Sequence, residues 1–483
     1  MQRNIDTLTK TIHKYLERNS LYVENPPWEI RKSDLGGFGV FAARSIETGE
    51  LIFRDYPIIL GPRAALTCPP LCVNCYGKDN LRPCEKKCGL KLCSDKCQNS
   101  SKHQKECKIV RQWQTRPIPE ELSEKLGKVF SPIRAILLSD EDKKVVRCLK
   151  AHISDQHGFE VDVMKKVLYL DVKEDEEMFM RFVCCVMDAN AFEVIVGSEN
   201  NQSSVKGLYP LGSLANHSCT PNTIHVFDNN QHMIVRASTF IPKGTEIFHS
   251  YSRVIWGTPT RRFHLFRTKH FLCKCQRCED PTEFGSYVSA ILCKNCKTGK
   301  VIPIDPLIHN GKWQCEGCAE SINKKDVAAL SSLLGSTLNS FTNDDVEIML
   351  KFITTKLATV VPENNETVVE LKYKLIWILG HERGFTWTEL SDDHLLAKEK
   401  FCGELLALLE LLRLGQCKMR GLLLYELYCC HAEQKRRQAK AGSASKTSDK
   451  SLLLEAADIL MYDVGAPPEI KKLWPDEIKL REQ

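Results

Sequence analysis

The stretch "LANHSCTPN", from Leu214 to Asn222, places a histidine two residues before a cysteine and surrounds both with asparagines and a proline. Three structures suit this arrangement: a cysteine nucleophile with its base, a metal ligand, or a tight turn. The other cysteines decide between them, because a metal site needs several ligands close together. The interpretation of Cys219 therefore depends on the rest of the chain.

The composition is that of a soluble globular protein of roughly three domains. The chain has 483 residues, of which 43% are hydrophobic and 27% are charged. Its net charge of +6 is too small for this length to indicate a nucleic-acid binder, so we expect no direct contact with nucleic acid. No run of about 18 apolar residues occurs, and we expect no membrane span.

The N-terminal sequence "NIDTLTKTIHKYLERN" mixes apolar and charged residues at helical spacing, unlike the apolar core of a secretory signal. It predicts a short amphipathic helix. With no export signal, we expect the 23 cysteines to lie in a reducing compartment. Disulfides rarely persist there, and metal binding becomes the default explanation for so many cysteines.

The first cysteine cluster contains eight soft ligands, which is the number that two tetrahedral zinc ions require. Their interleaved order predicts a cross-brace, in which alternate pairs share one ion. The first ion is assigned Cys72, Cys75, Cys93 and Cys97, and the second is assigned Cys84, Cys88, His103 and Cys107. Zinc would supply much of the folding energy of so small a segment, on the order of 10 kcal/mol per site. The alternative is a set of buried or disulfide-bonded cysteines.

The later cysteines predict two more sites. Cys273, Cys275 and Cys278 are one ligand short, and Cys219 is the first candidate upstream. Two CxxC pairs form a fourth site, with the ligands Cys293, Cys296, Cys315 and Cys318, although paired CxxC motifs are also found in redox-active proteins. The remaining cysteines are predicted to be free core thiols: Cys68, Cys148, Cys184, Cys185, Cys402, Cys417, Cys429 and Cys430.

Between the cysteine clusters, β-prone and helical segments alternate. "GGFGVFAARSIETGELIFRDYPIIL" and "ASTFIPKGTEIFHSY" predict two parts of one β-rich domain, and "IHVFDNNQHMIVRAS" predicts a hairpin. Residues 119–205 are mostly helical in pattern, and the leucine-rich sequence beyond about residue 325 predicts an all-helical domain. The fold class is therefore α+β.

Five motifs in this order resemble the SET and MYND domain (SMYD) family of protein-lysine methyltransferases, and its arthropod-type branch. They are "GGFGVFA", the eight-ligand cluster, "GLYPLGSLANHSCTPN", "GTEIFHSY" and "FLCKCQRC". The resemblance spans nearly the whole chain. It implies an N-terminal helix (1–24), a SET N-terminal part (26–66), a MYND zinc finger (72–107), a helical insert (108–205), the SET core (206–256), a post-SET zinc segment (257–320) and a helical C-terminal domain (325–483).

The resemblance also implies the cofactors S-adenosylmethionine (SAM) and zinc, and residues that bind them. Cys219 corresponds to the cysteine that completes the post-SET zinc site, and Tyr251 to the active-site tyrosine, which also contacts SAM. The other residues that correspond to SAM contacts are Gly37, Phe38, Gly39, Asn190, Asn216, His217 and Phe271. Each has a structural alternative, such as a helix asparagine for Asn190 or a core aromatic for Phe271. Methyl transfer is an in-line displacement that needs alignment rather than an acid/base pair.

Two positions depart from the family pattern. Cys84 and Cys88 are separated by three residues where the family usually has two, which strains chelation without forbidding it. Lys269 stands where many relatives have a tyrosine that lines the lysine channel. The expectation is a protein that binds SAM but methylates slowly, or accepts a restricted substrate.

The expected function is therefore SAM-dependent methylation of a lysine in a histone or another protein, in the nucleus and cytoplasm. The alternative is a catalytically weak or inactive adaptor that assembles transcriptional repressor complexes. The resemblance further implies a proline-rich peptide partner for the MYND module. A zinc hydrolase is excluded, because each predicted zinc site has four protein ligands and no open position.

Overall fold

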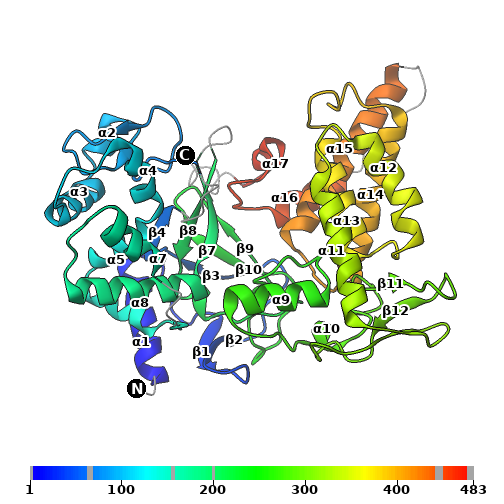
Figure 1. The fold of residues 1–483 in the computed structure, drawn as a ribbon, viewed down its shortest axis with the longest axis horizontal. Helices are drawn as coiled ribbons and strands as arrows, with labels where there is room; N and C mark the ends of the chain where they lie inside the picture. The colour runs from blue at the N-terminus through cyan, green and yellow to red at the C-terminus, as the bar shows by residue number, and fades with distance from the viewer. Residues whose placement is uncertain (1–3, 63–68, 154–157, 198–201, 441–449, 476–483) are drawn as a thin grey trace.

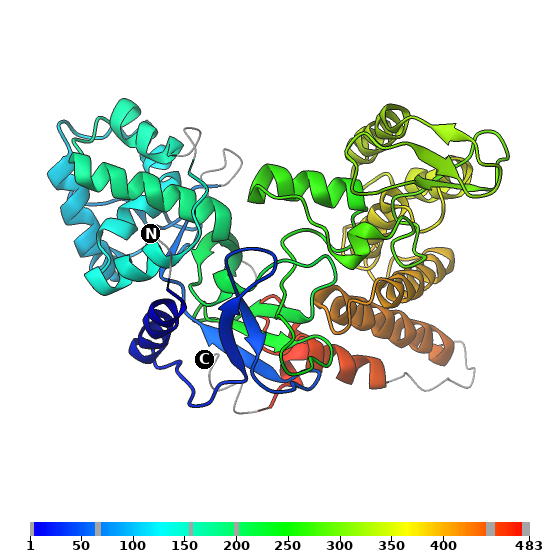
Figure 2. The ribbon, with the colours of Figure 1, turned by 90° about the horizontal axis from the view of Figure 1, so that it is seen from below.

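The computed structural model describes residues 4–62, 69–153, 158–197, 202–440 and 450–475; Cys68, predicted to be a free thiol, lies outside them. Two lobes face each other (Figures 1 and 2). One lobe contains the β-rich segments and the first cysteine cluster, and the other contains the C-terminal helices and the last cysteine cluster. This mixture of sheets and helices confirms the predicted α+β class.

Three small antiparallel sheets form the β-rich core. They are β1 (Trp28–Lys32) with β2 (Phe38–Ala42), β3 (Leu51–Asp55) with β10 (Met233–Ala237) and β9 (Thr223–Phe227), and β4 (Ile59–Pro62) with β8 (Ser203–Leu208) and β7 (Phe192–Val196). Strands β9 and β10 are the predicted hairpin. Gly49 turns the chain before β3 with φ +83°, a conformation that glycine adopts without strain.

Helices cover one side of this core (Figure 2). They are α1 (Ile5–Arg18), α2 (Asp95–Gln98), α3 (Ser101–Trp113), α4 (Glu120–Lys128), α5 (Ser131–Ile136), α6 (Asp140–Cys148), α7 (Phe159–Asp162), a π-helical turn η1 (Val163–Val167) and α8 (Glu174–Asn190); β5 (Arg82–Pro83) and β6 (Lys91–Leu92) lie in the cysteine cluster. The segment predicted to be helical as far as residue 205 ends instead in strands β7 and β8. The reason is that "FEVIV" is rich in β-branched residues, which favour a strand.

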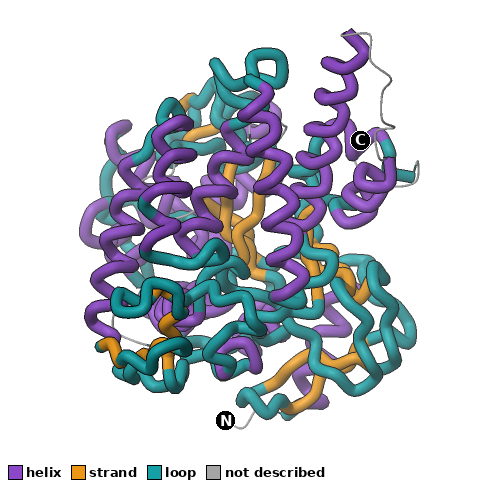
Figure 3. The backbone as a smooth tube through the Cα atoms, turned by 90° about the vertical axis from the view of Figure 1, so that its right-hand side faces the viewer, coloured by secondary structure: helices purple, strands orange, loops and turns teal. Residues whose placement is uncertain are grey.

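Helix α9 (Thr258–Lys269) lies between the two lobes in Figure 1 and leads into the second lobe. The helices of the second lobe pack side by side in Figure 3. Its elements are α10 (Gln276–Glu279), β11 (Ile291–Leu292), β12 (Lys300–Pro303), β13 (Trp313–Cys315), β14 (Ser321–Ile322), α11 (Lys324–Ser340), α12 (Val346–Thr355), η3 (Leu357–Thr359), α13 (Glu366–Ile378), α14 (Asp392–Leu411), α15 (Lys418–Lys440), α16 (Lys450–Ile459) and α17 (Pro468–Lys472). Of the helices within the described ranges, none has the length and apolar character needed to cross a bilayer.

Contacts on two sides of the β-rich core join the lobes and position the site. The outer face of β9 and β10 packs on the last helices, where Ile224 and Ile234 share a core with Trp474. The Arg236 guanidinium donates to the carbonyls of Asp458 (2.8 Å) and Ile459 (2.6 Å). On the other side of the β-rich core, the end of α9 reaches the end of α8.

Candidate active site and metal centres

The stretch that contains Asn216 is fixed at its start by a buried carboxylate. Asp55, at the end of β3, accepts hydrogen bonds from the backbone N–H groups of Leu211 (2.7 Å) and Gly212 (2.9 Å). Complete burial raises the pKa of Asp55 to about 7, although these hydrogen bonds oppose the shift. The short 3-10 helix η2 (Gly212–Leu214) follows, so the position of the next turn is set by strand β3.

Two segments far apart in sequence then run side by side in parallel. The His249 N–H donates to the carbonyl of Asn216 (2.9 Å), and the Ser218 N–H donates to the carbonyl of His249 (3.0 Å). His217 and His249 are partners in an isolated parallel β-bridge. This pairing brings Tyr251, two residues after His249, next to His217.

The Asn216 carboxamide joins the glycine-rich stretch to the site. Its Nδ2 donates to the Phe38 carbonyl (3.2 Å) and to Glu246 Oε1 (2.6 Å), while the Ser33 hydroxyl donates to Glu246 Oε2 (2.9 Å). A Cβ atom at Gly39 would lie 2.2 Å from Glu246 Oε1. Only glycine therefore allows this close packing, which places Phe38 and Gly39 beside Asn216.

His217 connects the tyrosine to a cysteine cluster. Its Nδ1 accepts a hydrogen bond from the Tyr251 N–H (3.0 Å), and its Nε2 lies 3.3 Å from Cys219 Sγ. Its ring centroid lies 5.3 Å from that of Tyr251 and 5.8 Å from that of Phe271. Both ring nitrogens are thus engaged within the protein, which leaves the backbone and the ring face of His217 for any contact with a ligand.

The Tyr251 side chain is held by the same turn. Its hydroxyl donates to the Ala215 carbonyl at 2.6 Å. Burial, and secondly the negative charge of Glu246, raise the pKa of the phenol, so Tyr251 keeps its proton at neutral pH. The Tyr251 oxygen is therefore neutral, and its hydrogen bond to Ala215 fixes the direction of its lone pairs.

Lys269, at the C-terminus of α9, lies against the face of Tyr251. Its Nζ is 5.8 Å from the Tyr251 ring centroid and donates to the backbone carbonyls of Asp188 (3.3 Å) and Ala189 (3.1 Å). These carbonyls belong to the last turn of α8, where a cation is favourable. Burial nevertheless lowers the pKa of Lys269 to about 8.

Asn190 lies near Lys269 but its amide is directed elsewhere. Its Nδ2 donates to the carbonyls of Lys150 (2.6 Å) and Val186 (2.7 Å), which fixes the end of α8. The structure thus brings together Phe38, Gly39, Asn216, His217, Tyr251 and Phe271. Asn190 stands at the edge of this group, next to the carbonyls that hold Lys269.

The structure gathers the first cysteine cluster into two groups. One is formed by Cys72, Cys75, Cys93 and Cys97, and the other by Cys84, Cys88, His103 and Cys107. Within each group the ligand atoms lie within 4.8 Å of one another. Amide groups donate to two of the sulfurs, Asn74 to Cys97 and Gln98 to Cys84 (both 3.4 Å), as supporting residues around zinc thiolates do.

Two further groups lie in the second half of the chain: Cys219, Cys273, Cys275 and Cys278, and Cys293, Cys296, Cys315 and Cys318. In the third group, Cys219 Sγ lies 3.5 Å from Cys278 Sγ, and the buried Arg261 donates to Cys278 Sγ (3.6 Å). The fourth is built on the four-stranded sheet β11–β14. Thiolate and imidazole ligands at tetrahedral spacing suit zinc, so all four groups are able to hold this ion.

Comparison with known proteins agrees with this geometry. Residues 37–252 match the family model for the SET domain. The SET domain-containing protein SmydA-8, isoform B, of Drosophila melanogaster is 31% identical over 416 residues, which cover 84% of this chain and 91% of the fly protein. The chain belongs to the SMYD family of SET-domain proteins. This confirms the predicted family, and the fly relative agrees with the arthropod-type branch.

Two other relatives are named for an enzymatic activity. The histone-lysine N-methyltransferase SMYD3 of Homo sapiens is 30% identical over 268 residues, covering 50% of this chain and 59% of the human protein. The histone-lysine N-methyltransferase ASHR1 of Arabidopsis thaliana is 27% identical over 351 residues, covering 66% of this chain and 68% of the plant protein. The SET match includes the turn with Asn216 and ends one residue after Tyr251.

The sequence did not indicate the roles of Glu246 and Asp188. Glu246 stands inside the motif "GTEIFHSY", but nothing in that motif shows that its carboxylate holds Asn216 and Ser33. Asp188 uses its backbone carbonyl to hold Lys269, and its carboxylate Oδ2 lies 3.1 Å from His270 Nε2. A backbone acceptor has no residue-type signal, so this contact could not be predicted.

Proposed function

We propose that this protein transfers a methyl group from SAM to the ε-amine of a lysine in a protein substrate. The observation that carries the proposal is the single turn that presents Asn216 and His217 and also holds the Tyr251 hydroxyl through the Ala215 carbonyl. Relatives over much of the chain are named histone-lysine N-methyltransferases. A half-buried tyrosine held rigidly beside this turn suits the alignment of donor and acceptor.

The residues around Asn216 fit a cationic donor with an aromatic base. Glu246 supplies a carboxylate, Asn216 a carboxamide, and Phe271 an aromatic face. Gly37 has φ +77° and nothing within 4 Å of the place where a Cβ would be, so the backbone there is open to a ligand. When bound, SAM supplies a methyl group on a positively charged sulfur.

The protein's own contribution is to orient and desolvate the target amine. Because the Tyr251 hydroxyl donates to Ala215, its oxygen lone pairs are free to accept a hydrogen bond from the amine. The buried surroundings disfavour the charged ammonium form, which lacks the lone pair needed for attack. The amine proton leaves to solvent, and no dedicated base is required.

Labelled SAM tests this function. Wild-type protein is expected to transfer label to histones or to proteins of a cell lysate, and Tyr251→Phe to reduce the rate by about 100-fold, because the aligning oxygen is lost. Calorimetry is expected to show nearly the same SAM affinity for both. The control is Tyr22→Phe at a 40% exposed tyrosine, whose rate should match that of wild type.

If wild type and Tyr251→Phe were equally silent on both substrate mixtures, the enzyme proposal would be refuted. The adaptor alternative is not favoured, because the contacts of Asn216, His217 and Tyr251 are intact. Calorimetry separates the two: an adaptor with a decayed site should bind no SAM.

We further propose that the protein acts in the nucleus and cytoplasm, on chromatin and in transcriptional repressor complexes. The names of its relatives support this, since they include histone-lysine methyltransferases. Fractionation of cells with an antibody to the protein checks the compartments. Absence of the protein from both fractions would contradict the proposal.

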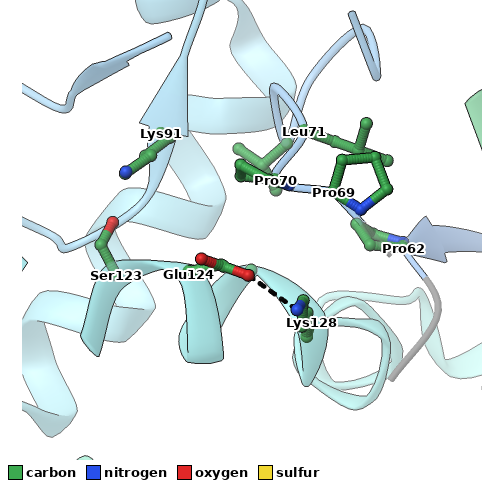
Figure 4. Close-up of a pocket in the computed structure, with 10 residues that line it drawn as sticks. Pro62, Pro69, Pro70, Leu71, Lys91, Ser123, Glu124 and Lys128 are labelled. Atoms are coloured by element: carbon green, nitrogen blue, oxygen red, sulfur yellow. Dashed lines mark ion pairs between the residues drawn. The ribbon is translucent and has the colours of Figure 1, made fainter. Parts of the chain in front are cut away.

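A proline-rich peptide remains our proposed partner for the MYND module. Figure 4 shows a pocket between this module and α4, lined by Pro69, Pro70 and Leu71, with an ion pair between Lys128 and Glu124 (2.7 Å). Its volume is only about 20 Å³, too small for a proline ring. The peptide would therefore use the exposed face of the module, and titration of labelled proline-rich peptides checks this.

A further inference from the structure

The side chain of Lys269 brings a primary amine to the tyrosine that is proposed to align the methyl acceptor. Its Nζ lies 5.8 Å from the centroid of the Tyr251 ring. The Tyr251 hydroxyl is held by the carbonyl of Ala215, directly before the proposed SAM contacts Asn216 and His217. An amine of the protein's own chain therefore lies beside the place where the proposed reaction needs one.

Two backbone carbonyls hold this amine in a fixed orientation. The Lys269 Nζ donates to the carbonyls of Asp188 (3.3 Å) and Ala189 (3.1 Å), and within the residues that the structure describes it donates to no other acceptor. An uncharged lysine amine has two N–H groups and one lone pair. When both N–H groups donate to these carbonyls, the lone pair is directed away from them and is left to attack a carbon atom.

Burial makes the uncharged form of Lys269 accessible at neutral pH. It lowers the pKa of the ammonium to about 8; the carboxylate of Asp188 opposes this shift, and the charge of Lys206 adds to it by a smaller amount. At pH 7 roughly a tenth of the amine is then without a proton, whereas an exposed lysine with a pKa of about 10.4 is almost fully charged. A desolvated lysine of this kind is a competent nucleophile.

We propose that Lys269 is itself a methyl acceptor, and that the protein methylates its own chain at this position in an intramolecular reaction. This inference rests on the proposed methyltransferase function and names a modification site for it. The ammonium first loses a proton to solvent. The Nζ lone pair then forms a bond to the methyl carbon, and the bond from that carbon to the sulfur of SAM breaks. The electron pair of the broken bond stays on the sulfur, which becomes the neutral thioether of S-adenosylhomocysteine.

The same two carbonyls limit the modification to one methyl group. A monomethylated ammonium keeps two N–H groups, so it still donates to both Asp188 and Ala189. A second methyl group would leave a single N–H, and one of the two carbonyls would lose its hydrogen bond. We therefore expect monomethyl-lysine at Lys269, without dimethyl-lysine.

Peptide mapping by mass spectrometry tests the site. Wild-type protein is isolated from the cells that express it and digested without added SAM, so the readout is the covalent state of the chain. One methyl group is expected on the peptide that contains Lys269. Lys351, exposed on α12, is read in the same digest as the internal control and is expected to be unmodified. A Lys269 that stays unmodified before and after incubation with SAM would overturn the inference.

A time course shows whether the reaction takes place within one chain. Full-length protein translated in an extract depleted of SAM starts without the modification, and labelled SAM is then added alone. The fraction of Lys269 labelled per minute should not change over about a 100-fold range of protein concentration, and it should fall by about 100-fold in Tyr251→Phe. The control Lys351→Arg should follow wild type. A rate proportional to protein concentration, or equal rates in wild type and Tyr251→Phe, would contradict an intramolecular step at this site.

Labelling of histones added to the same samples separates this inference from the proposed function. Labelled histones with an unlabelled Lys269 would overturn self-methylation and leave the proposed function standing. A labelled Lys269 with unlabelled histones would support the inference while the proposed action on other proteins failed, and no label on either would overturn both. In Lys269→Arg, which keeps a cation at this place, the chain itself should take up no label.

Discussion

Gly39 shows how a single missing side chain shapes the site. A Cβ there would lie 2.2 Å from Glu246 Oε1 and 3.1 Å from Asn216 Nδ2, well inside contact distance. Gly39→Ala is therefore expected to push both side chains from their positions and to weaken SAM binding by about 10-fold or more. Calorimetry measures the affinity, and circular dichroism checks that the variant folds.

The matched control is Gly335→Ala in α11, where nothing lies within 4 Å of the added atom. This change should leave SAM affinity unaltered and raise the free energy of unfolding by about 0.5–1 kcal/mol, because alanine is the better helix former. Equal SAM affinity in Gly39→Ala and wild type would show that Asn216 does not contribute to the donor site.

At the residue scale, the sequence indicated which residues to consider for the site better than it indicated which atoms those residues contact. The motifs "GGFGVFA", "GLYPLGSLANHSCTPN" and "GTEIFHSY" were enough to select Phe38, Asn216 and Tyr251 as candidates. The hydrogen bond between His217 and the Tyr251 N–H could not be predicted, because it joins residues 34 apart in two segments that run in parallel. Because Cys219 and the Tyr251 N–H occupy both ring nitrogens, a contact between His217 and SAM would use its backbone or its ring face.

Among the elements, the third cysteine group ties the zinc segment to the active-site turn. Cys219 is its one ligand from the turn, and His217 Nε2 lies 3.3 Å from its sulfur. Cys219→Ser is expected to reduce zinc content by about one ion per chain and to weaken SAM binding together, because the support for His217 and Tyr251 is lost. Zinc analysis and calorimetry on the same sample measure both effects.

Cys417→Ser is the matched control, since Cys417 is partly buried and belongs to none of the four groups. It should retain all bound zinc and full SAM affinity. Loss of zinc without loss of SAM affinity in Cys219→Ser would contradict the coupling between the metal site and the donor site.

Cysteine spacing predicted more of the element arrangement than hydropathy did. A tetrahedral ion accepts only certain spacings, so all four ligand groups could be assigned from the sequence. The contact between the ends of α8 and α9 could not, because Lys269 binds backbone carbonyls. Strand β7 was missed because a short apolar run after a helix fits either structure.

In the whole molecule, the three small sheets do not by themselves hold the residues of the candidate site in place. The chain is braced from both sides, by the last helices that pack on β9 and β10 and by α9 that meets α8. Several segments with few core residues are held by cysteine groups instead, such as the group around Cys219 and Leu265. Metal ligation therefore replaces hydrophobic core where the chain is mostly loop.

Beneath the site, the β-rich core contains two neutral histidines, of which His249 is fully buried and His225 is half-buried. Burial lowers the pKa of His225 to about 4 and that of His249 well below its usual 6.5, and the two rings lie 5.1 Å apart between Phe192 and other aromatic residues. Protonation of either ring would place an unpaired charge inside this core. Folding stability is therefore expected to depend on pH.

Below pH 6.5 these two histidines bind protons in the unfolded chain but stay neutral in the folded core. The free energy of unfolding therefore falls as the pH decreases from 6.5 toward 4. For His225 alone, whose ring is partly exposed, the expected loss between pH 7 and pH 5 is about 1–2 kcal/mol. Denaturant unfolding at several pH values measures it. In the double variant His225→Gln/His249→Gln, the free energy of unfolding should depend less on pH. The control His309→Gln, in an exposed loop, should show the same pH dependence as wild type. An identical pH dependence in wild type and both variants would show that the two core histidines titrate normally.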